Sequence, residues 1–345
     1  DESGKAVASA GDVNGDGLDD LIVGAWKSDA IFTDAGRAYV VFGTTSTNAI
    51  NLSAVFNGSG GFALNGQAAT DYAGIAVAGA GDINGDGLAD LIVTASYSDP
   101  ASLTTAGRTY VVFGKTSSTN LDLSNVTTGS GGFVINGRCS LDMSGSSVAS
   151  AGDVNGDGLA DIIVGVQGAD PGSRTDAGCS YVIFGKGGTT AVELANVALE
   201  VGGGFVINGQ CLSDIAGWAV SGAGDVNGDG LADLIVGANY ADAPGGSDSG
   251  RSYVVFGKTS ATAINLSAVA LGSGGFVING QSASDLSGSA VSYAGDVNGD
   301  GLADLIVGAH QSDPPAGVNA GRSYVIFGRT ATAAIELSAV VAGSG

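Results

Sequence analysis

Hydrophobic residues along this chain gather in short runs that return at a regular interval. The four runs of the first interval are AVASAGD (6–12), DLIVGA (20–25), GRAYVVFG (36–43) and GGFALNGQ (60–67). Each run is short and bounded by Gly, Asn, Asp or Ser, and Val, Ile, Tyr and Phe are frequent, which is typical of β-strands joined by tight turns. Helical periodicity is nearly absent, and only LSAVF (52–56) and LANVALE (194–200) could form a turn or two of helix.

The interval is a sequence repeat of about 71 residues. Copies of the segment GDVNGDGLDDLIVGA begin at positions 11, 81, 152, 224 and 295. We therefore expect one domain (1–345) built from five repeats, at approximately 1–70, 71–141, 142–213, 214–284 and 285–345. The last repeat stops before its fourth run, so we expect it to contribute three strands and to leave the edge formed by residues 322–328 either unpaired or completed by a segment outside this sequence.

The second and third runs are almost continuously hydrophobic, so both faces of their strands must be covered. A β-propeller achieves this without helices, because each four-stranded antiparallel blade is sandwiched between two neighbours. The small residues of the first run suit the crowded innermost position of a blade, and the Tyr and Phe of the third run fill the wider space farther out. The sequence therefore predicts an all-β fold, a β-propeller. A five-bladed ring is favoured, and part of a seven-bladed ring or a β-solenoid are the alternatives.

A Gly-rich loop with oxygen-bearing side chains at alternate positions separates the first and second runs. Alternate positions of a tightly curled loop point towards one centre, and several carboxylates on a flexible loop suit Ca²⁺ better than Mg²⁺. We therefore predict five Ca²⁺ sites, one in each loop. The ligands of the first loop are Asp12, Asn14, Asp16, Asp20 and the backbone carbonyl of Leu18. Those of the other four are Asp82, Asn84, Asp86, Leu88, Asp90; Asp153, Asn155, Asp157, Leu159, Asp161; Asp225, Asn227, Asp229, Leu231, Asp233; and Asp296, Asn298, Asp300, Leu302, Asp304.

A metal-free Asn-Gly hairpin turn is the alternative interpretation of these loops, because that dipeptide alone favours a hairpin. It leaves the crowding of carboxylates unexplained, since like charges on one loop repel one another without a cation. An EF-hand does not fit, because the twelfth position of each loop is a Val in a predicted strand.

The charge of the chain narrows the choice of partners. Only 12 Lys and Arg residues stand against 34 Asp and Glu residues, and the formal net charge is −22. Such a surface repels phosphate backbones and anionic lipid, so we expect no nucleic-acid partner. No apolar run approaches the roughly 18 to 20 residues that span a bilayer, so we expect no membrane insertion.

The order Gly-x-Ala-Val, then GDVNGDGLADLIVGA, then GRSYVVFG resembles the FG-GAP repeat of the integrin α-subunit N-terminal propeller and its bacterial relatives. The resemblance covers essentially the whole chain, although integrin propellers have seven repeats and the Phe of the "FG" pair is replaced by Ser or Ala. It implies Ca²⁺ loops on one face of the propeller and partner contacts on the other. The candidates for that second face are Trp26, Tyr97, Trp218, Tyr240 and His310, for which packing or simple exposure is the alternative role.

These features predict an extracellular or cell-surface, calcium-binding adhesion or partner-binding module. Loops of this kind would be largely empty in a cytosol, and the partner would be a protein or a glycan on the face opposite the loops. We expect no catalytic activity, because His310 is the only histidine and no nucleophile recurs beside it. A lectin, or a structural subunit of a surface layer or filament that self-associates through the edge of the last blade, are the alternatives.

Two of the three cysteines could form a cross-strand disulfide. Cys179 opens the third run of its repeat and Cys211 closes the fourth. If Tyr181 pairs near Gly209, the two cysteines become neighbours, which predicts a Cys179–Cys211 bridge and leaves Cys139 as the odd thiol. Three independent thiols are the alternative.

Overall fold

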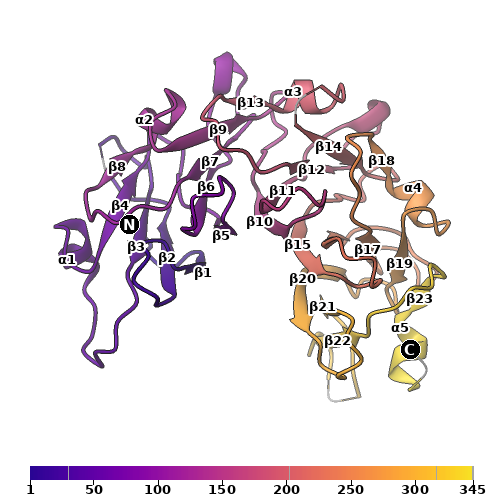
Figure 1. Cartoon of the computed structure of the whole chain (residues 1–345). Helices are drawn as coiled ribbons and strands as arrows, with labels where there is room; N and C mark the ends of the chain where they lie inside the picture. The colour runs from indigo at the N-terminus through magenta and orange to yellow at the C-terminus, as the bar shows by residue number, and fades with distance from the viewer. Residues whose placement is uncertain (30, 202, 316, 344–345) are drawn as a thin grey trace. The chain divides into compact units, whose positions relative to one another are not determined.

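The structure is a computed structural model that describes residues 1–29, 31–201, 203–315 and 317–343. Its elements are almost all β-strands, arranged in five sheets (Figure 1). The chain divides into two compact units, one of residues 1–150, 159–162 and 184–202, the other of residues 151–158, 163–183 and 203–345. In the part of the chain that is described, no helix has the length and apolar character needed to span a membrane.

Each repeat builds its sheet in the same order. The first strands are β1 (Val7–Gly11), β5 (Val77–Gly81), β10 (Ser147–Gly152), β15 (Ala219–Gly224) and β20 (Ser287–Gly295). The second strands are β2 (Asp20–Ala25), β6 (Asp90–Ala95), β11 (Asp161–Val166), β16 (Asp233–Ala238) and β21 (Asp304–Ala309). The third strands are β3 (Arg37–Val41), β7 (Arg108–Val112), β12 (Cys179–Ile183), β17 (Arg251–Val255) and β22 (Arg322–Ile326). The fourth strands are β4 (Gly61–Asn65), β9 (Gly132–Asn136), β14 (Gly204–Asn208) and β19 (Gly275–Asn279).

Neighbouring strands of this series pair antiparallel, for example β1 with β2, β2 with β3 and β3 with β4. Four repeats therefore contain the expected four-stranded antiparallel sheet, and the predicted all-β propeller fold is confirmed. In the fifth repeat, the described residues form a three-stranded sheet of β20, β21 and β22.

Short helices follow the third strands at α1 (Leu52–Phe56), α2 (Leu123–Thr127), α3 (Leu194–Val197), α4 (Leu266–Val269) and α5 (Leu337–Val341). Two 3₁₀ turns, η1 (Pro100–Ser102) and η2 (Pro171–Ser173), interrupt the loops after β6 and β11. The weak helical signals at LSAVF and LANVALE are thus confirmed.

One connection between repeats was not predicted. A two-residue strand pairs in parallel with the fourth strand of the preceding repeat, so that each of the first four sheets gains a fifth strand. Two residues are too few to show a periodicity, so these strands could not be predicted from the hydrophobic pattern. These strands are β8 (Leu121–Asp122), β13 (Val192–Glu193), β18 (Ile264–Asn265) and β23 (Ile335–Glu336).

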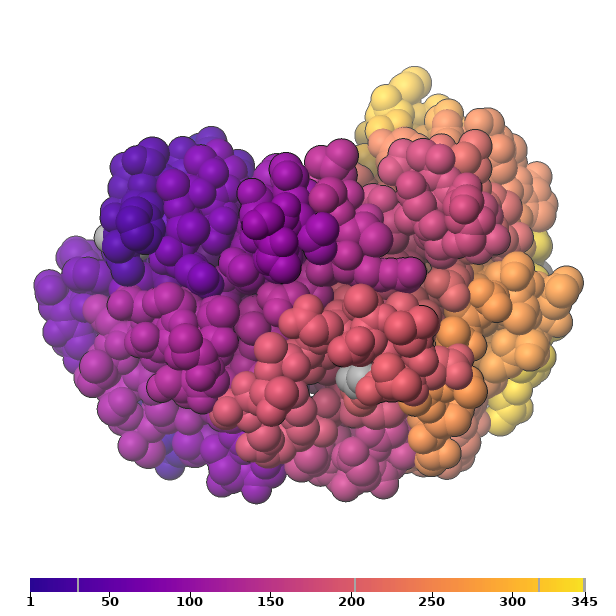
Figure 2. Space-filling model, turned by 90° about the horizontal axis from the view of Figure 1, so that it is seen from above, coloured from indigo at the N-terminus to yellow at the C-terminus, as the bar shows by residue number. Residues whose placement is uncertain are grey.

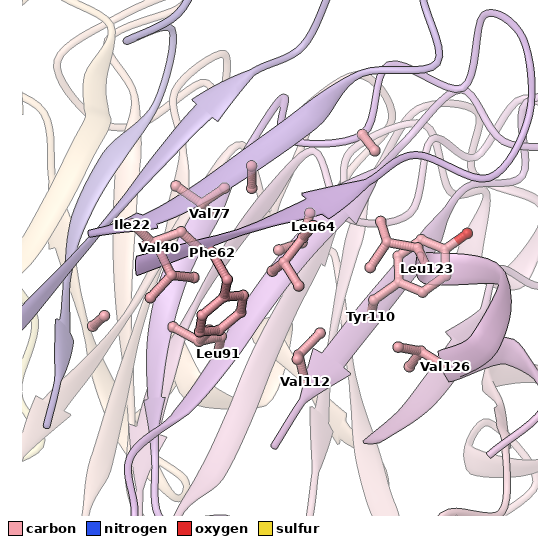
Figure 3. Packing of buried hydrophobic residues seen from close by; sticks show 14 of the residues in the cluster. Ile22, Val40, Phe62, Leu64, Val77, Leu91, Tyr110, Val112, Leu123 and Val126 are labelled. Carbon is pink, nitrogen blue, oxygen red and sulfur yellow. The ribbon is translucent and has the colours of Figure 1, made fainter. Parts of the chain in front are cut away.

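Packing of sheet against sheet forms the core, as the first two repeats show (Figure 3). Ile22, Val40 and Phe62 are cross-strand neighbours on one face of the first sheet. They belong to the same buried cluster as Leu91 of the second repeat. Leu91 and the next residue, Ile92, point to opposite faces of their strand, and both are fully buried. Covering both faces is what the continuous hydrophobic runs require.

Polar contacts add to this packing between consecutive repeats. The Tyr110 hydroxyl donates a hydrogen bond to Gln67 Oε1 of the preceding repeat at 3.0 Å. The same contact joins Tyr253 to Gln210 at 2.9 Å. Because these Tyr side chains are buried, the partner Gln satisfies a hydroxyl that would otherwise be costly to bury.

The predicted disulfide between Cys179 and Cys211 is wrong. In the pairing of β12 with β14, Cys179 lies opposite Asn208, three residues away from the expected register. The strand ends at Asn208, and Cys211 lies in the exposed turn beyond it, where its backbone N–H donates to Asp214 Oδ2 at 3.1 Å. The two thiols are therefore not cross-strand neighbours, and no disulfide joins any of the cysteines in the described chain.

A buried acid gives the fold a pH dependence. Asp71 is 6% exposed, and burial raises its pKa to about 6. The folded pKa exceeds the unfolded value of about 3.9, so the folded state holds the proton more tightly and stability falls as pH rises between these values. We expect Asp71→Asn to raise the free energy of unfolding by about 1 to 2 kcal/mol near pH 7.5, and much less near pH 4, in urea titrations. The exposed acid Asp176, changed to Asn, is the control, and an equal gain at both pH values would contradict this role of Asp71.

Candidate metal-binding loops

The candidate metal loops occupy one end of their sheets. Each loop connects the first strand of a repeat to the antiparallel second strand, as residues 12–19 connect β1 to β2. The connection from the second strand to the third lies at the opposite end of the same sheet, because successive strands reverse direction. The acidic loops and the aromatic candidates after the second strands are therefore separated by the length of a strand.

The first residue of each loop organises the loop backbone. Asp12 Oδ1 accepts hydrogen bonds from the N–H groups of Gly15 at 2.7 Å and Asp16 at 3.1 Å, and its Oδ2 accepts one from Gly17 at 2.8 Å. These backbone donors, with Gly17 foremost, hold the pKa of Asp12 below its usual value. Gly15 and Gly17 have φ angles of 78° and 87°, a region in which an L side chain is strained.

The next two side chains close the loop on itself. Asn14 Oδ1 accepts from the Asp16 N–H at 2.8 Å, while Asn14 Nδ2 donates to Asp16 Oδ2 at 3.0 Å. Asp16 Oδ1 accepts from the Leu18 N–H at 2.9 Å. The three bonds to the leading Asp recur in the other loops at 2.7, 3.0 to 3.1 and 2.9 Å, with Asp82, Asp153, Asp225 and Asp296 as acceptors.

The acid at position 9 of the loop is buried at the start of the second strand. Asp90 is fully buried, and its Oδ1 accepts from the Gly114 N–H at 2.8 Å while its Oδ2 accepts from the Ile83 N–H at 2.9 Å. Burial, with a smaller contribution from the nearby charges of Asp86 and Asp82, raises its pKa to about 6. In the fourth repeat the same causes raise the pKa of Asp233 to about 7. This Asp therefore ties the loop to the end of the third strand while lying close to two other carboxylates.

The loops carry the oxygen ligands of a cation site, but these oxygens accept hydrogen bonds from the backbone N–H groups of the same loop. Three carboxylates, one amide oxygen and one backbone carbonyl per loop are hard oxygen donors of the kind that Ca²⁺ prefers. Among the described residues, however, no group of three His, Cys, Asp or Glu side chains is arranged so that it could hold a metal ion. A cation would therefore have to take over oxygens that now accept N–H bonds.

Two clusters of aromatic side chains lie at the ends of the sheets that are opposite the acidic loops. In the first unit, the Trp26 ring lies 5.1 Å from the Tyr72 ring, which lies 5.3 Å from the Tyr97 ring. Lys27 Nζ lies 4.6 Å from the centre of the Trp26 ring, and the Trp26 indole N–H donates to Glu2 Oε2 at 2.9 Å. We call Trp26, Tyr72 and Tyr97 the aromatic row. Sequence reasoning missed Tyr72, although it is an aromatic residue where other repeats carry Met143, Ile215 and Leu286.

The remaining candidates lie in the second unit. The rings of Trp218 and Tyr240 are 6.2 Å apart, and both side chains are partly exposed. His310 is exposed and lines a pocket of about 470 Å³ together with Ser289 and Arg322. Among the described residues, His310 Nε2 lies 3.5 Å from Nε2 of the neighbouring Gln311 side chain.

The comparison with protein families identifies the repeats. The FG-GAP repeat family matches residues 3–41, 73–112, 144–183, 216–255 and 287–326, which is more than half of the chain. Each matched segment runs from the start of the first strand, or just before it, through the acidic loop to the third strand.

Known proteins share the same region. Integrin alpha-PS2 of Drosophila melanogaster is 28% identical over 67% of this chain, and integrin alpha pat-2 of Caenorhabditis briggsae is 30% identical over 69%. Phosphatidylinositol-glycan-specific phospholipase D of Bos taurus is 34% identical over 48% of the chain. The matches cover 15 to 18% of the length of these three relatives. With five matched repeats and five sheets whose first three strands are arranged in the same order, the chain belongs to the FG-GAP repeat family and forms a β-propeller similar to the N-terminal region of integrin α chains.

Proposed function

We propose that this chain is a calcium-binding β-propeller that works outside the cell as an adhesion or partner-binding module and catalyses no reaction. The observation that carries the proposal is the acidic loop, repeated five times with the same residues. Each copy brings three carboxylates to one short loop, where burial and, to a smaller extent, the charges of the neighbouring carboxylates raise the pKa values of Asp90 and Asp233. A bound cation would relieve this repulsion at every loop.

In the first loop, Asp12, Asn14, Asp16, Asp20 and the Leu18 carbonyl would hold the ion. Bound Ca²⁺ would supply the positive charge that offsets the three carboxylates. Asp20 would keep its structural role, because its Oδ1 accepts from the Gly43 N–H at 2.7 Å at the end of the third strand. The loop would thereby couple metal binding to the packing of its own sheet.

The setting outside the cell follows from the strength expected of such loops. Calcium modules of extracellular proteins bind with dissociation constants of about 10⁻⁴ to 10⁻³ M, which suits extracellular and not cytosolic calcium levels. The integrin names among the relatives support the same setting.

The hydrogen bonds of the position-9 acids and the surroundings of His310 support the proposal that the chain catalyses no reaction. Position-9 acids such as Asp90 accept hydrogen bonds from backbone N–H groups, and the exposed His310 side chain has the Gln311 amide, 3.5 Å away, as its neighbour. One relative is named as a phospholipase, but the match covers 18% of that protein. We therefore assign this region of the chain a binding role.

The aromatic row is the best candidate for the partner surface. Its rings stand at the end of the sheet opposite the acidic loops, next to Lys27 and Glu2. Partly exposed aromatic rings beside charged groups are typical of surfaces that bind proteins or glycans.

Calcium should stabilise the fold strongly. If each site has a dissociation constant near 10⁻⁴ M, about 1 mM Ca²⁺ adds about 1.4 kcal/mol per site, or about 7 kcal/mol for five independent sites. We expect the melting temperature, measured by circular dichroism, to fall markedly when EDTA replaces Ca²⁺. Identical melting curves in calcium and EDTA would contradict the proposal.

Site-directed variants assign this effect to the loops. Equilibrium dialysis should find about five Ca²⁺ ions per chain, and Asp86→Asn should remove one of them, because it neutralises one ligand of one loop. Asp176→Asn, an equal change of charge outside the loops, should leave the number unchanged. A number unaffected by Asp86→Asn would place calcium elsewhere.

The buried acid of the loop should contribute to the stability of the fold even without calcium. Asp90→Ala leaves the N–H groups of Ile83 and Gly114 without their acceptor, so we expect the free energy of unfolding in EDTA to fall by about 2 to 4 kcal/mol. Asp86→Asn should change it by less than about 0.5 kcal/mol, because that side chain is exposed. Chemical denaturation measures both, and equal effects would mean that the two acids do not have separate roles.

The partner surface can be tested without knowing the partner. Arrays of glycans and of extracellular proteins, probed with calcium-loaded protein, show which class it binds. We expect Trp26→Ala to weaken binding on the positive array by at least about tenfold, since truncating an aromatic anchor has such effects. Asp176→Asn should bind normally. Binding that Trp26→Ala leaves intact would exclude the aromatic row as the contact surface.

A further inference from the structure

The dipeptide Asn-Gly occurs ten times in this chain, in contrasting surroundings. Five copies lie in the acidic loops, where the Asn is the third loop residue: Asn14, Asn84, Asn155, Asn227 and Asn298. Four copies stand at the ends of the fourth strands, and the remaining copy, Asn57-Gly58, follows α1. The chain therefore shows what different environments do to one reactive dipeptide.

An Asn-Gly dipeptide can react with itself. The backbone nitrogen of the Gly attacks Cγ, the side-chain carbonyl carbon of the Asn, and a Gly offers no Cβ to obstruct the approach. A bond forms between this nitrogen and Cγ, the Cγ–Nδ2 bond breaks, and ammonia leaves with the proton of the Gly N–H. Water then opens the cyclic imide at either of its carbonyls and yields aspartate or isoaspartate. This acyl transfer needs an available nitrogen and a polarised carbonyl held beside it.

The attacking nitrogen of the loop copies faces a carboxylate. Gly15 N–H donates to Asp12 Oδ1 at 2.7 Å, and the same bond measures 2.7 Å in each of the other four loops. An anionic acceptor forms a strong, charge-assisted bond and draws the proton away from the nitrogen. The Gly of every loop is also exposed, so solvent base can reach that proton. Every repeat, from indigo to yellow, reaches the surface in Figure 2.

The carbonyl that is attacked is held and polarised in the same loops. Asn14 Oδ1 accepts from the Asp16 N–H at 2.8 Å, and Asn14 Nδ2 donates to Asp16 Oδ2 at 3.0 Å. The other loops repeat these bonds at 2.7 to 2.8 Å and at 2.8 to 2.9 Å. The Asp16 N–H stabilises the negative charge that grows on Oδ1 during the attack, as an oxyanion donor does. Because both bonds reach over Gly15 to the next residue, they hold the Asn side chain against the Gly15 peptide unit.

The copies at the ends of the fourth strands lack an available nitrogen. Gly66 N–H donates to Gly36 O at 2.9 Å, and the three equivalent N–H groups donate to backbone carbonyls at 2.9 to 3.0 Å. These glycines are buried, and a Cβ atom on Gly66 would lie 2.1 Å from Ala35 O. The carbonyl alone does not distinguish the two environments, since Asn65 Oδ1 also accepts a hydrogen bond, from Arg37 Nε at 2.9 Å. The nitrogen of Gly66 can reach Cγ only if two closely packed strands separate.

We propose that the Asn of each acidic loop is a site of self-modification, which converts to aspartate or isoaspartate through a cyclic imide without an enzyme. The Asn residues at the strand ends stay intact. Each conversion adds one negative charge to a loop that already carries three carboxylates, and the isoaspartate product also lengthens the loop backbone by one carbon. The proposal concerns side chains of the loops themselves and does not require bound calcium.

The test follows all ten Asn-Gly sites in one sample of the whole chain. The protein is incubated in EDTA at mildly alkaline pH, so that the result does not depend on calcium, and is then digested with pepsin at acidic pH. Mass spectrometry measures the conversion of each Asn, and electron-transfer fragmentation distinguishes isoaspartate from aspartate. A synthetic peptide of residues 10–19, AGDVNGDGLD, gives the rate without the fold.

The loops and the strand ends should differ in opposite directions from the free peptide. We expect the five loop sites to convert at least as fast as the peptide, because the fold holds the reacting groups together. We expect the four strand-end sites to convert at least about tenfold more slowly than the peptide, because their nitrogen is held elsewhere. In concentrated urea all sites should approach one rate, since the difference comes from the fold.

Asn57-Gly58 is a matched control within the same molecule. Asn57 is exposed, and Gly58 N–H donates to the neutral carbonyl of Val55 at 2.9 Å. We expect this site to convert more slowly than the loop sites, because no carboxylate acts on its nitrogen. Asn14→Gln should stop conversion at that loop alone, since the longer side chain would have to close a larger ring. Asn57→Gln should leave all loop sites unchanged.

Three outcomes would overturn the proposal. The first is conversion of the loop sites more slowly than the free peptide, and the second is conversion of the strand-end sites as fast as the loop sites. The third is a pattern of rates that persists in urea. None of these measurements concerns a bound ion or a melting temperature, so a failure here is distinguishable from a failure of the proposed function.

Discussion

The central sheets of this protein depend on being covered on both faces, whereas the second strands of the first and fifth sheets leave Leu21 and Ile306 exposed. The second and third strands place apolar side chains on both sides, and in the middle of the chain successive residues such as Leu91 and Ile92 are both fully buried. A sheet of this composition is not stable alone, because burying one face leaves the other in water. Stability is therefore shared between consecutive repeats, and contacts such as the Tyr110–Gln67 hydrogen bond reinforce a packing that the apolar faces already demand.

Strand positions and fold class could be predicted because the information is repeated. Runs such as DLIVGA are continuously hydrophobic, and five copies at one spacing exclude most other architectures. The disulfide prediction failed because it required the register of β12 against β14 to within one residue. That register depends on the close approach of Gly204 and Gly209 to the neighbouring backbone, which no hydrophobic pattern reports. The strand β8 escaped prediction for a related reason, since its partner belongs to another repeat.

The acidic loops illustrate a different limit. Residue types and spacing indicate the ion that a loop suits, yet the same oxygens also satisfy backbone N–H groups, as Asp12 does for Gly15 and Gly17. The residue types and their spacing cannot distinguish a carboxylate that binds a cation from one that accepts backbone hydrogen bonds. Burial separates them in part, because Asp90 is enclosed and tied to the third strand whereas Asp86 is exposed. The aromatic row shows the complementary case, in which Tyr72 becomes relevant only when two repeats are placed side by side.

Because of the two-residue strands such as β8, one sheet of the structure does not coincide with one repeat of the sequence. A sheet is completed by residues that follow it in the next repeat, so a segment cut at the boundaries of the sequence repeat lacks part of its own sheet and carries part of another. Recombination that adds or removes a repeat is then tolerated only when the new neighbour offers the same kind of dipeptide, an apolar residue (Leu121, Val192, Ile264 or Ile335) followed by Asp, Glu or Asn. This requirement favours duplication of neighbouring repeats over exchange with unrelated ones, and near-identical copies along one chain are the sequence record that such a history would leave.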